Sequence, residues 1–585
     1  MLRGFCVWAP RPREVELLLP DGRHPMTRDE DDWWHACVNV EPGSTYAFSL
    51  DGGDPRPDPQ GLALPDGPHG WSQLYDPDEY VWSDGNWTGV ELSGAVVYEL
   101  HVGTFTRAGT LDAAIGRLQH LVDLGVSMVE LMPVAPFPGE HGWGYDGVAP
   151  FAVHEPYGGP AALQRFVDAA HGMGLGVCLD VVYNHLGPDG NYLGEFGPYL
   201  TETHHTPWGP ALNLDAPGSD HVRRWVLDNA TQWLRDFHLD ALRLDAVHEL
   251  HDNRALHLLE EMSREVDVLS EHVGRQLWLI AETDRNDPGT VTPRGRGNVV
   301  GGLGLHAQWA DDVHHALHVA LTGETQGYYA DFGAEPGPDG ESPLAKVLRS
   351  PFFHDGTYSS FRGRRHGRPV DPAGMPGWRF VASLQTHDQV GNRAVGDRIS
   401  ASVSPGLLAC GAAILLTSPW TPMLFMGEEW GASTPWQYFT DHTDPDLASA
   451  VRDGRRAEFA EFGWDAEEVP DPQDPETFRR SKLDWSEVES DPHARLLTWY
   501  TALITLRRSR VDLRDPHLDA VEVEHDTEAG TLRLQRGGHT VVVNLSDRKH
   551  RFPVTGKVLL SWEPGVQALS GEVEVPPLST VVLGP

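Results

Sequence analysis

The sequence predicts a central (β/α)₈ barrel with one β-sandwich before it and a second after it. Three observations support this prediction: strand-like and helix-like segments alternate from residue 96 onward, and shorter alternating runs occur both before residue 88 and after residue 511. Strands that alternate with helices are typical of a parallel sheet covered by helices, and short alternating runs are typical of antiparallel sheets. A chain of 585 residues is also too long for one hydrophobic core.

Residues 1–88 are expected to form the first β-sandwich. Short apolar runs such as Val15–Leu19 and 46–50 are separated by turn sequences such as Pro20-Asp-Gly22. This pattern is typical of an antiparallel sandwich. Trp8, Trp33 and Trp34 could bind carbohydrate, but large aromatic side chains more often fill a core, and we expect core positions for them.

Residues 89–511 are expected to form the barrel. Apolar residues recur at helical spacing in segments such as 111–124, 160–171 and 222–237, and buried strands are expected between such segments. The eight strands are expected at residues 96–102, 127–132, 176–182, 239–244, 276–281, 303–308, 378–385 and 423–426. Because barrels of this kind carry their active sites at the carboxyl ends of the strands, polar residues that end these strands should converge.

Residues 512–585 are expected to form the second β-sandwich. Short alternating runs return at residues 531–534, 540–544 and 558–562. No internal repeat or low-complexity tract stands out in the chain. We therefore expect the two β-sandwiches and the barrel to be separate globular domains.

The charge balance excludes several classes of partner. The 85 Asp and Glu residues against 45 Lys and Arg residues give a net charge of -40, which repels phosphate backbones and anionic lipid, so we expect neither nucleic acid nor membrane partners. The first residues lack a charged segment followed by a long apolar one, and no apolar run of about 18 residues occurs, so we expect a cytoplasmic protein. We also expect a monomer. The four cysteines have no CxxC spacing, so neither a zinc site nor a disulfide framework is expected.

The fourth predicted strand ends in a charged pair, within the segment 240–248. Arg243 and Asp245 are two positions apart, so in a strand both side chains point to the same face. The guanidinium would keep Asp245 ionised, as the nucleophile of a glycosidase requires. Taken alone, the pair is more simply read as a structural ion pair.

Polar residues also end three other predicted strands. These residues are Asp180, Asn184 and His185 after the third strand, Glu282 after the fifth, and His387, Asp388 and Asn392 after the seventh. Each set alone could be an ordinary polar loop or a helix N-cap. Four sets at four strand ends instead predict a catalytic site.

Two carboxylates with different protonation states would suit the hydrolysis of a glycosidic bond with retention. Asp245 is the candidate nucleophile. Glu282 is the candidate acid, because the apolar segment 277–281 and the charge of Asp245 should raise its pKa. Asp388 would be a third carboxylate beside the sugar. The neighbours available to hold sugar hydroxyls are His185, His387 and Asn392.

These motifs resemble, in order and in strand position, the four short motifs of the α-amylase clan, glycoside hydrolase family thirteen. The resemblance implies that Asp245 is the nucleophile, Glu282 the general acid/base and Asp388 the transition-state stabiliser. It covers most of the chain, including an N-terminal sandwich similar to that of isoamylases and glycogen branching enzymes. No cofactor is implied, and no metal ion is expected because Asn184 is not accompanied by an acidic insertion.

Longer stretches most resemble the maltooligosyltrehalose trehalohydrolase family, whose members release trehalose by cutting the adjacent α-1,4 bond. Those stretches are residues 97–105, 141–146, 206–215, 308–315 and 387–392. The resemblance implies maltooligosyltrehalose and α-1,4-glucans as substrates, with Trp143 and Tyr145 stacking on the sugar before the cut. Further substrate-binding candidates are His185, Arg243, His248, Glu249, Gln308, Trp309, Asp311, Asp312, His387, Gln389 and Asn392.

Specificity for trehalose requires a groove that accepts two glucoses joined 1,1. Residues 308–312 and Gln389 are the candidates to supply its donors and acceptors, although both could be loops bonded only to themselves. Clan members often have Lys-His after the nucleophile, whereas here Ala246-Val-His248-Glu249 follows, and the absence of that Lys disfavours an ordinary α-amylase. Two alternatives stay open: a branching or debranching enzyme of the clan, and a non-catalytic glucan-binding protein, which the three intact carboxylates disfavour.

Overall fold

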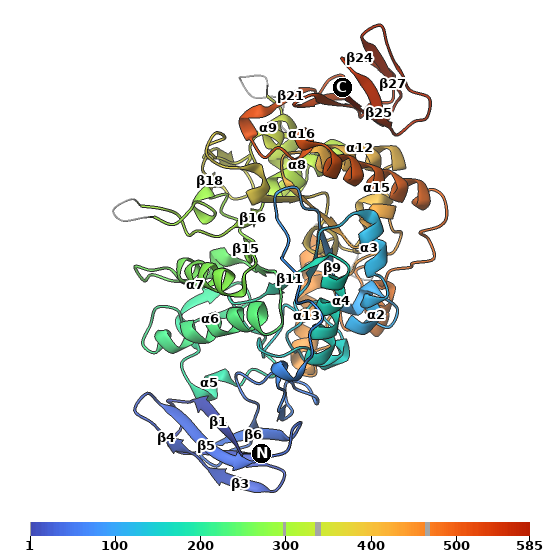
Figure 1. Ribbon diagram of the computed structural model, residues 1–585. Helices are drawn as coiled ribbons and strands as arrows, with labels where there is room; N and C mark the ends of the chain where they lie inside the picture. Colours follow the sequence, from blue (N-terminus) through green and yellow to red (C-terminus); the bar gives the residue numbers. More distant parts are fainter. Residues whose placement is uncertain (1, 296–299, 334–340, 462–467) are drawn as a thin grey trace.

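The centre of the molecule is a closed barrel of eight parallel strands, seen in a computed structural model that describes residues 2–295, 300–333, 341–461 and 468–585 (Figure 1). In order around the barrel, the strands are Val97–Leu100 (β9), Met128–Leu131 (β10), Gly176–Val181 (β11), Ala241–Leu244 (β14), Trp278–Ala281 (β15), Ala307–Trp309 (β16), Phe380–Ser383 (β19) and Thr421–Phe425 (β20). Each strand overlaps the segment predicted for it, and the predicted (β/α)₈ barrel is confirmed.

The interior of the barrel changes from apolar to charged along the strands. Each strand contributes at least one residue to an apolar cluster, and β15 and β16 contribute two: Val97, Met128, Cys178, Ala241, Trp278, Ile280, Ala307, Trp309, Val381 and Met423. Residues two positions further along a strand point to the same face. In four adjacent strands that next position is charged and buried, at Glu99, Glu130, Asp180 and Arg243. Charged side chains therefore lie just below the carboxyl ends of the strands.

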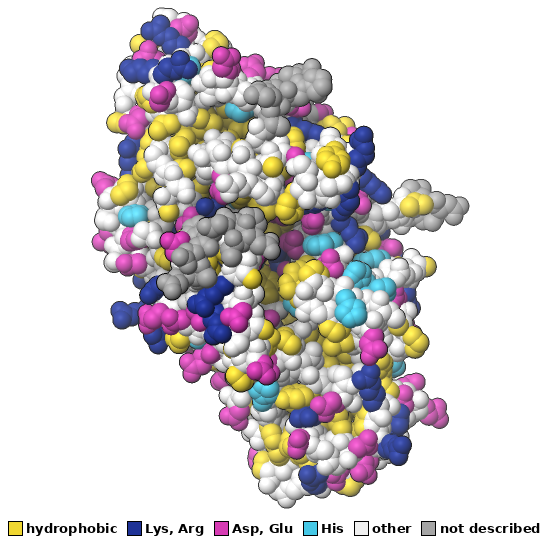
Figure 2. Space-filling view, turned by 180° about the vertical axis from the view of Figure 1, so that it is seen from behind, with side chains coloured by type: hydrophobic (Ala, Val, Ile, Leu, Met, Phe, Trp, Pro, Cys, Tyr) yellow, Lys and Arg dark blue, Asp and Glu magenta, His cyan; other side chains and the backbone are white. Residues whose placement is uncertain are grey.

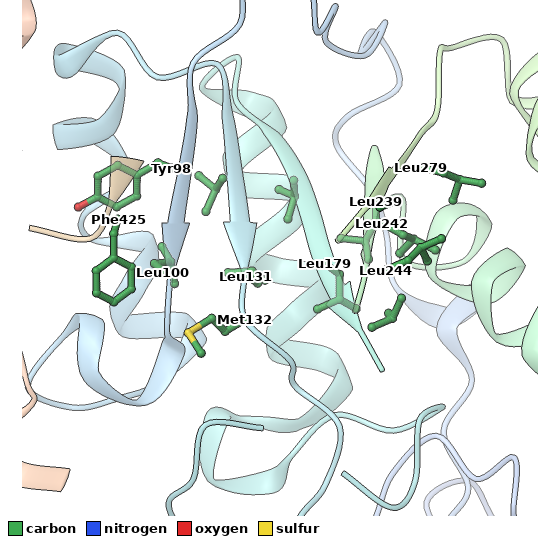
Figure 3. Close-up of a cluster of buried hydrophobic side chains, with 14 of the residues drawn as sticks. Tyr98, Leu100, Leu131, Met132, Leu179, Leu239, Leu242, Leu244, Leu279 and Phe425 are labelled. Carbon is green, nitrogen blue, oxygen red and sulfur yellow. The ribbon is translucent and has the colours of Figure 1, made fainter. Parts of the chain in front are cut away.

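The outer face of the barrel carries a row of leucines. Leu100, Leu131, Leu179, Leu242 and Leu279 are register partners on five neighbouring strands, and all are buried (Figure 3). Burying one such side chain contributes roughly 1.5–3 kcal/mol, so this row fixes the register between neighbouring strands as well as the helix packing.

Helices surround the barrel. The longer ones are Gly159–Gly172 (α4), Ser219–Arg235 (α6), Leu258–Val273 (α7), Asp311–Thr322 (α8), Pro405–Thr417 (α12), Pro445–Glu461 (α13) and His493–Ser509 (α15). The apolar periodicity of residues 111–124 predicted helix throughout, but the structure has two short helices, Leu111–Ile115 (α2) and Leu118–Leu124 (α3). The break falls at Gly116, which ends α2, because glycine is a poor helix former.

The N-terminal β-sheets lie at one end of the molecule (Figure 1). Their strands are Leu2–Trp8 (β1), Val15–Leu19 (β2), Gly22–Pro25 (β3), Thr27–Arg28 (β4), Trp33–Asn39 (β5), Thr45–Leu50 (β6), Pro55–Arg56 (β7) and Ser72–Gln73 (β8). Trp8 and Trp34 are buried as predicted, whereas Trp33 is only partly buried. The Trp8 ring stacks on His221 of α6 at 4.6 Å, so this tryptophan also joins the sandwich to the barrel.

The C-terminal β-sheets lie at the opposite end (Figure 1). Their strands are Val521–Asp526 (β21), Thr531–Arg536 (β22), His539–Asn544 (β23), His550–Pro553 (β24), Lys557–Ser561 (β25), Ala568–Leu569 (β26), Glu572–Val575 (β27) and Ser579–Gly584 (β28). Buried valines such as Val542, Val573 and Val581 pack between the two sheets, and both predicted sandwiches are confirmed. Within the described ranges, no helix is long and apolar enough to cross a membrane.

Candidate active site

Arg243 organises the charged end of the barrel. Its Nη1 donates hydrogen bonds to Asp180 Oδ2 at 2.8 Å and to Asp245 Oδ1 at 2.7 Å. The guanidinium is wholly buried and lies 4.4 Å from the centre of the Trp309 ring. Asn184 Nδ2 donates to the other oxygen of Asp245 at 2.9 Å. Both oxygens of Asp245 thus accept hydrogen bonds, one of them charge-assisted, which suits an anionic carboxylate.

Glu282 lies next to Asp245 at the end of the following strand. Burial raises the pKa of Glu282 to about 8, and the neighbouring Asp245 charge acts in the same direction against the opposing Arg243. Its Oε2 accepts a hydrogen bond of 2.7 Å from the backbone N–H of Ala246. Ala246 has a φ of 38°, which is uncommon for a residue other than glycine. Glu282 therefore carries a proton at neutral pH while Asp245 lies beside it with an arginine partner.

Asp388 reaches the site from the short helix His387–Gly391 (α10), which follows β19. Its side chain is 46% exposed, and Oδ1 lies 3.4 Å from Nε2 of His387. His387 is buried beneath it, with Nδ1 2.5 Å from Glu99 Oε1 and Nε2 2.8 Å from the Tyr145 hydroxyl. Burial disfavours the imidazolium, but the Asp388 and Glu99 carboxylates raise the pKa of His387 to about 9.

A cavity of about 290 Å³ opens over these groups. Its wall consists of Trp143, Tyr145, Asp146, His185, Trp208, Asp245, Ala246, His248, Glu282, His387, Asp388, Asn392, Tyr438 and Thr440. The wall includes all three predicted catalytic carboxylates and six of the predicted substrate-binding residues. A concave site with aromatic walls and a few converging polar groups is typical of small-ligand binding.

Three predicted substrate-binding residues have contacts that differ from the expectation. Gln308 is wholly buried on β16, because its strand position points away from the cavity. Asp312 is also buried, and its Oδ2 accepts hydrogen bonds from Asn286 and from the backbone of the loop at residues 353–354. Gln389 Oε1 accepts from the backbone N–H and the hydroxyl of Thr386 in a capping box. Asp312 and Gln389 hold neighbouring loop segments, and none of the three residues lies in the cavity wall.

Four other predicted residues lie next to the cavity without lining it. Arg243 and Trp309 lie beneath its floor, in contact with each other. Glu249 lies 3.3 Å from His251 in an ion-pair geometry. Burial raises the pKa of Asp311 to about 6, and the charge of Asp388 adds to that effect.

The structure adds wall residues that the sequence reasoning missed. Trp208 lies between the strands Leu200–Thr206 (β12) and Gly209–Leu212 (β13); it is 53% exposed and stacks on His185 at 4.9 Å. Tyr438 and Thr440 come from the loop after β20. Trp208 belongs to a stretch quoted above for its resemblance, and Tyr438 to the aromatic run 436–439, so both had a signal in the sequence.

Glu99 was also missed as a site residue, although a glutamate inside an otherwise apolar strand is a signal. It accepts hydrogen bonds from both the backbone N–H and the ring of His387. In the part of the chain that the structure describes, no group of three or more His, Cys, Asp or Glu residues could hold a metal ion.

Comparison with known proteins identifies two regions and several full-length relatives. Residues 73–205 match the model of the α-amylase catalytic domain, and residues 4–77 match carbohydrate-binding module 48, the isoamylase N-terminal domain. The chain is 55% identical to malto-oligosyltrehalose trehalohydrolase of Arthrobacter ramosus, over 96% of each chain. It is 52% identical to the enzyme of that name from Rhizobium sp. (strain M-11), over 99% of this chain and 97% of the relative. A crystal structure from Salmonella typhimurium, provisionally described as an α-amylase, has a TM-score of 0.90 at 38% identity and covers 100% of this chain and 98% of that one.

Proposed function

The chain belongs to the malto-oligosyltrehalose trehalohydrolase family of the α-amylase clan, and from that premise we propose that it hydrolyses the α-1,4 bond next to the terminal trehalose of maltooligosyltrehalose. The observation that carries the proposal is the trio of carboxylates in the cavity, each in a different environment. Asp245 has an arginine partner, Glu282 is buried with a raised pKa, and Asp388 is exposed beside a histidine. Two carboxylates with separated protonation states are the requirement for acid-assisted glycoside cleavage.

In the proposed first step, an oxygen of Asp245 attacks the anomeric carbon while Glu282 gives its proton to the glycosidic oxygen. The bond from the anomeric carbon to that oxygen breaks, trehalose leaves with the proton, and a glycosyl ester of Asp245 remains. In the second step, Glu282 takes a proton from water, the water oxygen attacks the anomeric carbon, and the ester bond breaks. The configuration at the anomeric carbon is retained because it is inverted twice.

Substrate contacts follow from the cavity wall. We assign the sugar before the cut to the aromatic side of the wall, at Trp143 and Tyr145, and we assign hydroxyl contacts to His185, His248 and Asn392. Trp208 joins them as an exposed ring at the edge of the cavity. An exposed tryptophan can stack on the face of a sugar without losing many hydrogen bonds to water.

The decisive experiment compares maltooligosyltrehalose with a plain maltooligosaccharide of equal length. We expect free trehalose as the product, and a kcat/KM at least about tenfold higher for maltooligosyltrehalose, which corresponds to roughly 1.4 kcal/mol. Equal kcat/KM values for the two substrates would favour a general α-glucanase. New branch points or cleavage of α-1,6 bonds, without free trehalose, would favour a branching or debranching enzyme.

Stereochemistry offers a second test of the same mechanism. A retaining enzyme has its two carboxyl groups about 5–5.5 Å apart, whereas an inverting enzyme has them roughly 6.5–9.5 Å apart. Because the proposed mechanism retains the α configuration, the new reducing end of the maltooligosaccharide should appear first as the α-anomer in proton NMR. First appearance of the β-anomer would contradict a covalent role for Asp245.

We also propose that the chain divides into three domains, at residues 1–88, 89–511 and 512–585. β8 ends at Gln73 and β9 begins at Val97, which brackets the first limit, while the short helix Val511–Arg514 (α16) precedes β21 and overlaps the second. We further propose a cytoplasmic monomer. In support, all four cysteines are free, and a net charge of -40 opposes association of two copies.

A further inference from the structure

A connected row of polar groups runs beneath Asp388. Glu99 Oε1 lies 2.5 Å from His387 Nδ1, and Glu99 Oε2 accepts the backbone N–H of His387 at 3.0 Å. His387 Nε2 lies 2.8 Å from the Tyr145 hydroxyl, which donates to Asp180 Oδ2 at 2.6 Å. The same Asp180 oxygen accepts from Arg243 at 2.8 Å.

Counting hydrogens along this row determines the charge of His387. The Tyr145 hydroxyl has one hydrogen, and it is used toward Asp180. The Tyr145 oxygen can therefore only accept from His387, so Nε2 carries a hydrogen. Nδ1 faces the Glu99 carboxylate, so a hydrogen also lies between Nδ1 and Glu99. That hydrogen belongs on the ring, because an imidazolium is ordinarily a weaker acid than a carboxylic acid, with pKa values of about 6.5 and 4.3.

We infer that Glu99 is a positioning residue for the proposed reaction: it holds His387 as an imidazolium and fixes its Nε2–H beneath Asp388 and the sugar site. Glu99 touches neither substrate nor the reacting atoms, since it is buried and outside the cavity wall. The raised pKa of His387 agrees with this assignment. The titratable or charged groups that face His387 are Glu99 on β9, Glu130 on β10, Tyr145 and His101 on loops, Asp180 on β11, Arg243 on β14 and Asp388 on α10.

Asp245 and Asp388 each have a cation beneath them. Arg243 contacts Asp245, and His387 contacts Asp388. An arginine stays charged in almost any environment, but a buried histidine loses its proton unless a carboxylate compensates for its lost hydration. Glu99 supplies this compensation from the buried side of the ring, in addition to that from Asp388. Without the Glu99 charge, His387 would lose its proton at lower pH, and Asp388 would then lie near the Asp245 carboxylate without a counter-charge.

The test pairs Glu99→Gln with Glu130→Gln. Glu130 is the register partner of Glu99 on the neighbouring strand and is equally buried. Burial and the Glu99 charge raise the pKa of Glu130 to about 8, so it is already neutral, and the hydrogen bonds of the described residues do not join it to His387. Both substitutions keep the side-chain shape, but only Glu99→Gln removes a charge. Glu130→Gln is therefore a matched control for the effect of an isosteric change inside the barrel.

We expect Glu99→Gln to lower kcat by roughly tenfold to a hundredfold with a much smaller change in KM, because the lost interaction acts on the reacting sugar and not on the rest of the chain. The alkaline limb in the kcat–pH profile of Glu99→Gln should also move to lower pH, because His387 then loses its proton at a lower pH. Glu130→Gln should keep the kcat and the pH profile of the parent. Equal losses in both variants, or an unchanged profile in Glu99→Gln, would overturn the inference.

A measurement on the free parent protein does not depend on whether Glu99→Gln folds. In protein carrying ¹⁵N-labelled histidine, the ring nitrogens of His387 should both be protonated at neutral pH, with the signals assigned by their loss in His387→Asn. A neutral His387 would overturn the inference. Because no substrate is present, this result is separate from the trehalose assay: release of plain glucan products with a charged His387 would contradict only the proposed specificity.

Discussion

At the scale of single residues, three carboxylates share one cavity and differ in what surrounds them. Asp245 accepts hydrogen bonds on both oxygens from Arg243 and Asn184. Glu282 lies at the end of an apolar strand and accepts from one backbone N–H. Asp388 is exposed at the cavity edge. The environment, and not the type of side chain, is the basis for the roles of nucleophile and acid that we propose.

Replacing Asp245 by Asn should lower kcat on the order of 10⁴-fold or more, because a covalent intermediate can no longer form. The fold and glucan binding should persist, since Asn is nearly the same size. Steady-state kinetics together with a melting curve check this expectation. Asp146→Asn is the control, because Asp146 lies in the same wall without a proposed role in the chemistry. Full activity of Asp245→Asn would contradict the mechanism.

The pH dependence of kcat/KM should report Glu282. The acid must be protonated to donate to the leaving oxygen, so activity is present below its pKa and is lost above it. With a pKa raised by burial to about 8, the rate should fall about tenfold per pH unit at higher pH. Glu282→Gln should remove the part of this loss that is centred near pH 8, along with most of the activity, and leave only the loss due to deprotonation of His387 at higher pH. A rate that stays constant well above the pKa of Glu282 would show that another group donates the proton.

Two neighbouring aspartates on α8 should respond differently to substitution by Ala. Asp312 accepts one hydrogen bond from Asn286 and two from the loop at residues 353–354, so Asp312→Ala should cost roughly 1–3 kcal/mol of stability per donor left buried and unpaired. Asp311 lies close to Asp388, and Asp311→Ala should reduce the preference for maltooligosyltrehalose more than the cleavage of plain glucan. Melting curves and the ratio of kcat/KM for the two substrates separate these effects. An unchanged ratio in Asp311→Ala would remove Asp311 from the specificity site.

At the scale of elements, a buried histidine joins the linker after the N-terminal sandwich to the barrel. His171 on α4 lies 2.9 Å from Asp84 of the linker and 3.0 Å from Asp240, just before β14. Trp87 of the linker stacks on His171 at 4.5 Å and donates to Asp240 at 2.7 Å. This contact of Asp84, Trp87, His171 and Asp240, the linker clasp, ties three elements together.

The linker clasp should make stability depend on pH. Burial opposes the charge of His171, but the two aspartates raise its pKa above the usual 6.5. The contribution of His171 to the stability of the fold is therefore complete below pH 6.5 and is lost as pH rises through the raised pKa. Burial alone would raise the pKa of Asp84, yet His171 and His238 lower it to about 2. The contribution of Asp84 to stability is therefore complete above its ordinary pKa of 3.8 and is lost as pH falls toward 2. The full contribution therefore lies between about pH 4 and 6.5.

We expect Asp84→Asn to destabilise the protein by roughly 3–5 kcal/mol within that window, because it leaves a buried imidazolium with one partner fewer. The loss should shrink at alkaline pH, where His171 is neutral. Thermal unfolding at pH values inside and above the window measures the difference. Asp112→Asn is the control, since its ion pair with Arg165 is exposed and should be worth about 0–1 kcal/mol at any pH. Equal losses at both pH values would mean that the linker clasp is not charged.

At the scale of the whole molecule, the dominant feature is an excess of 40 negative charges. Acidic and basic side chains are interspersed over the face seen in Figure 2. Many acidic side chains of the described residues form ion pairs, such as those of Asp228 and Glu265 with Arg224. There are too few basic side chains to pair with all 85 acidic ones. The unpaired carboxylates repel one another most strongly in the compact folded state.

Added salt should therefore raise the melting temperature at neutral pH. Screening weakens both the ion pairs and the general repulsion, but exposed pairs contribute little, and the repulsion among the excess carboxylates is the larger effect. Melting curves in sodium chloride from about 0.01 M to 0.5 M test this, because the Debye length falls from about 30 Å to a few Å over that range. A melting temperature that falls with salt would mean that the ion pairs dominate.

Local sequence patterns were enough to predict the architecture and the chemical groups at the strand ends. Strand and helix periodicities are local properties, so the eight barrel strands and both sandwiches could be placed without knowledge of contacts. The proximity of Asp245, Glu282 and Asp388 could also be predicted, because the carboxyl ends of parallel barrel strands must lie together once the fold class is known. The pairing of Arg243 with Asp245 followed from the two-residue period of a strand.

Which side chains face the cavity depends on contacts between distant segments, which local patterns do not reveal. Glu99 and His387 are 288 positions apart and meet because β9 and β20 close the barrel and bring the residues after β19 over β9. Gln308 and Asp312 belong to a stretch with the right chemistry, yet both are buried, because a shift of one residue along a strand or helix changes which side of it a side chain occupies. Trp208 and Tyr438 enter the wall from long loops, whose paths depend on packing against distant segments and leave no local period in the sequence.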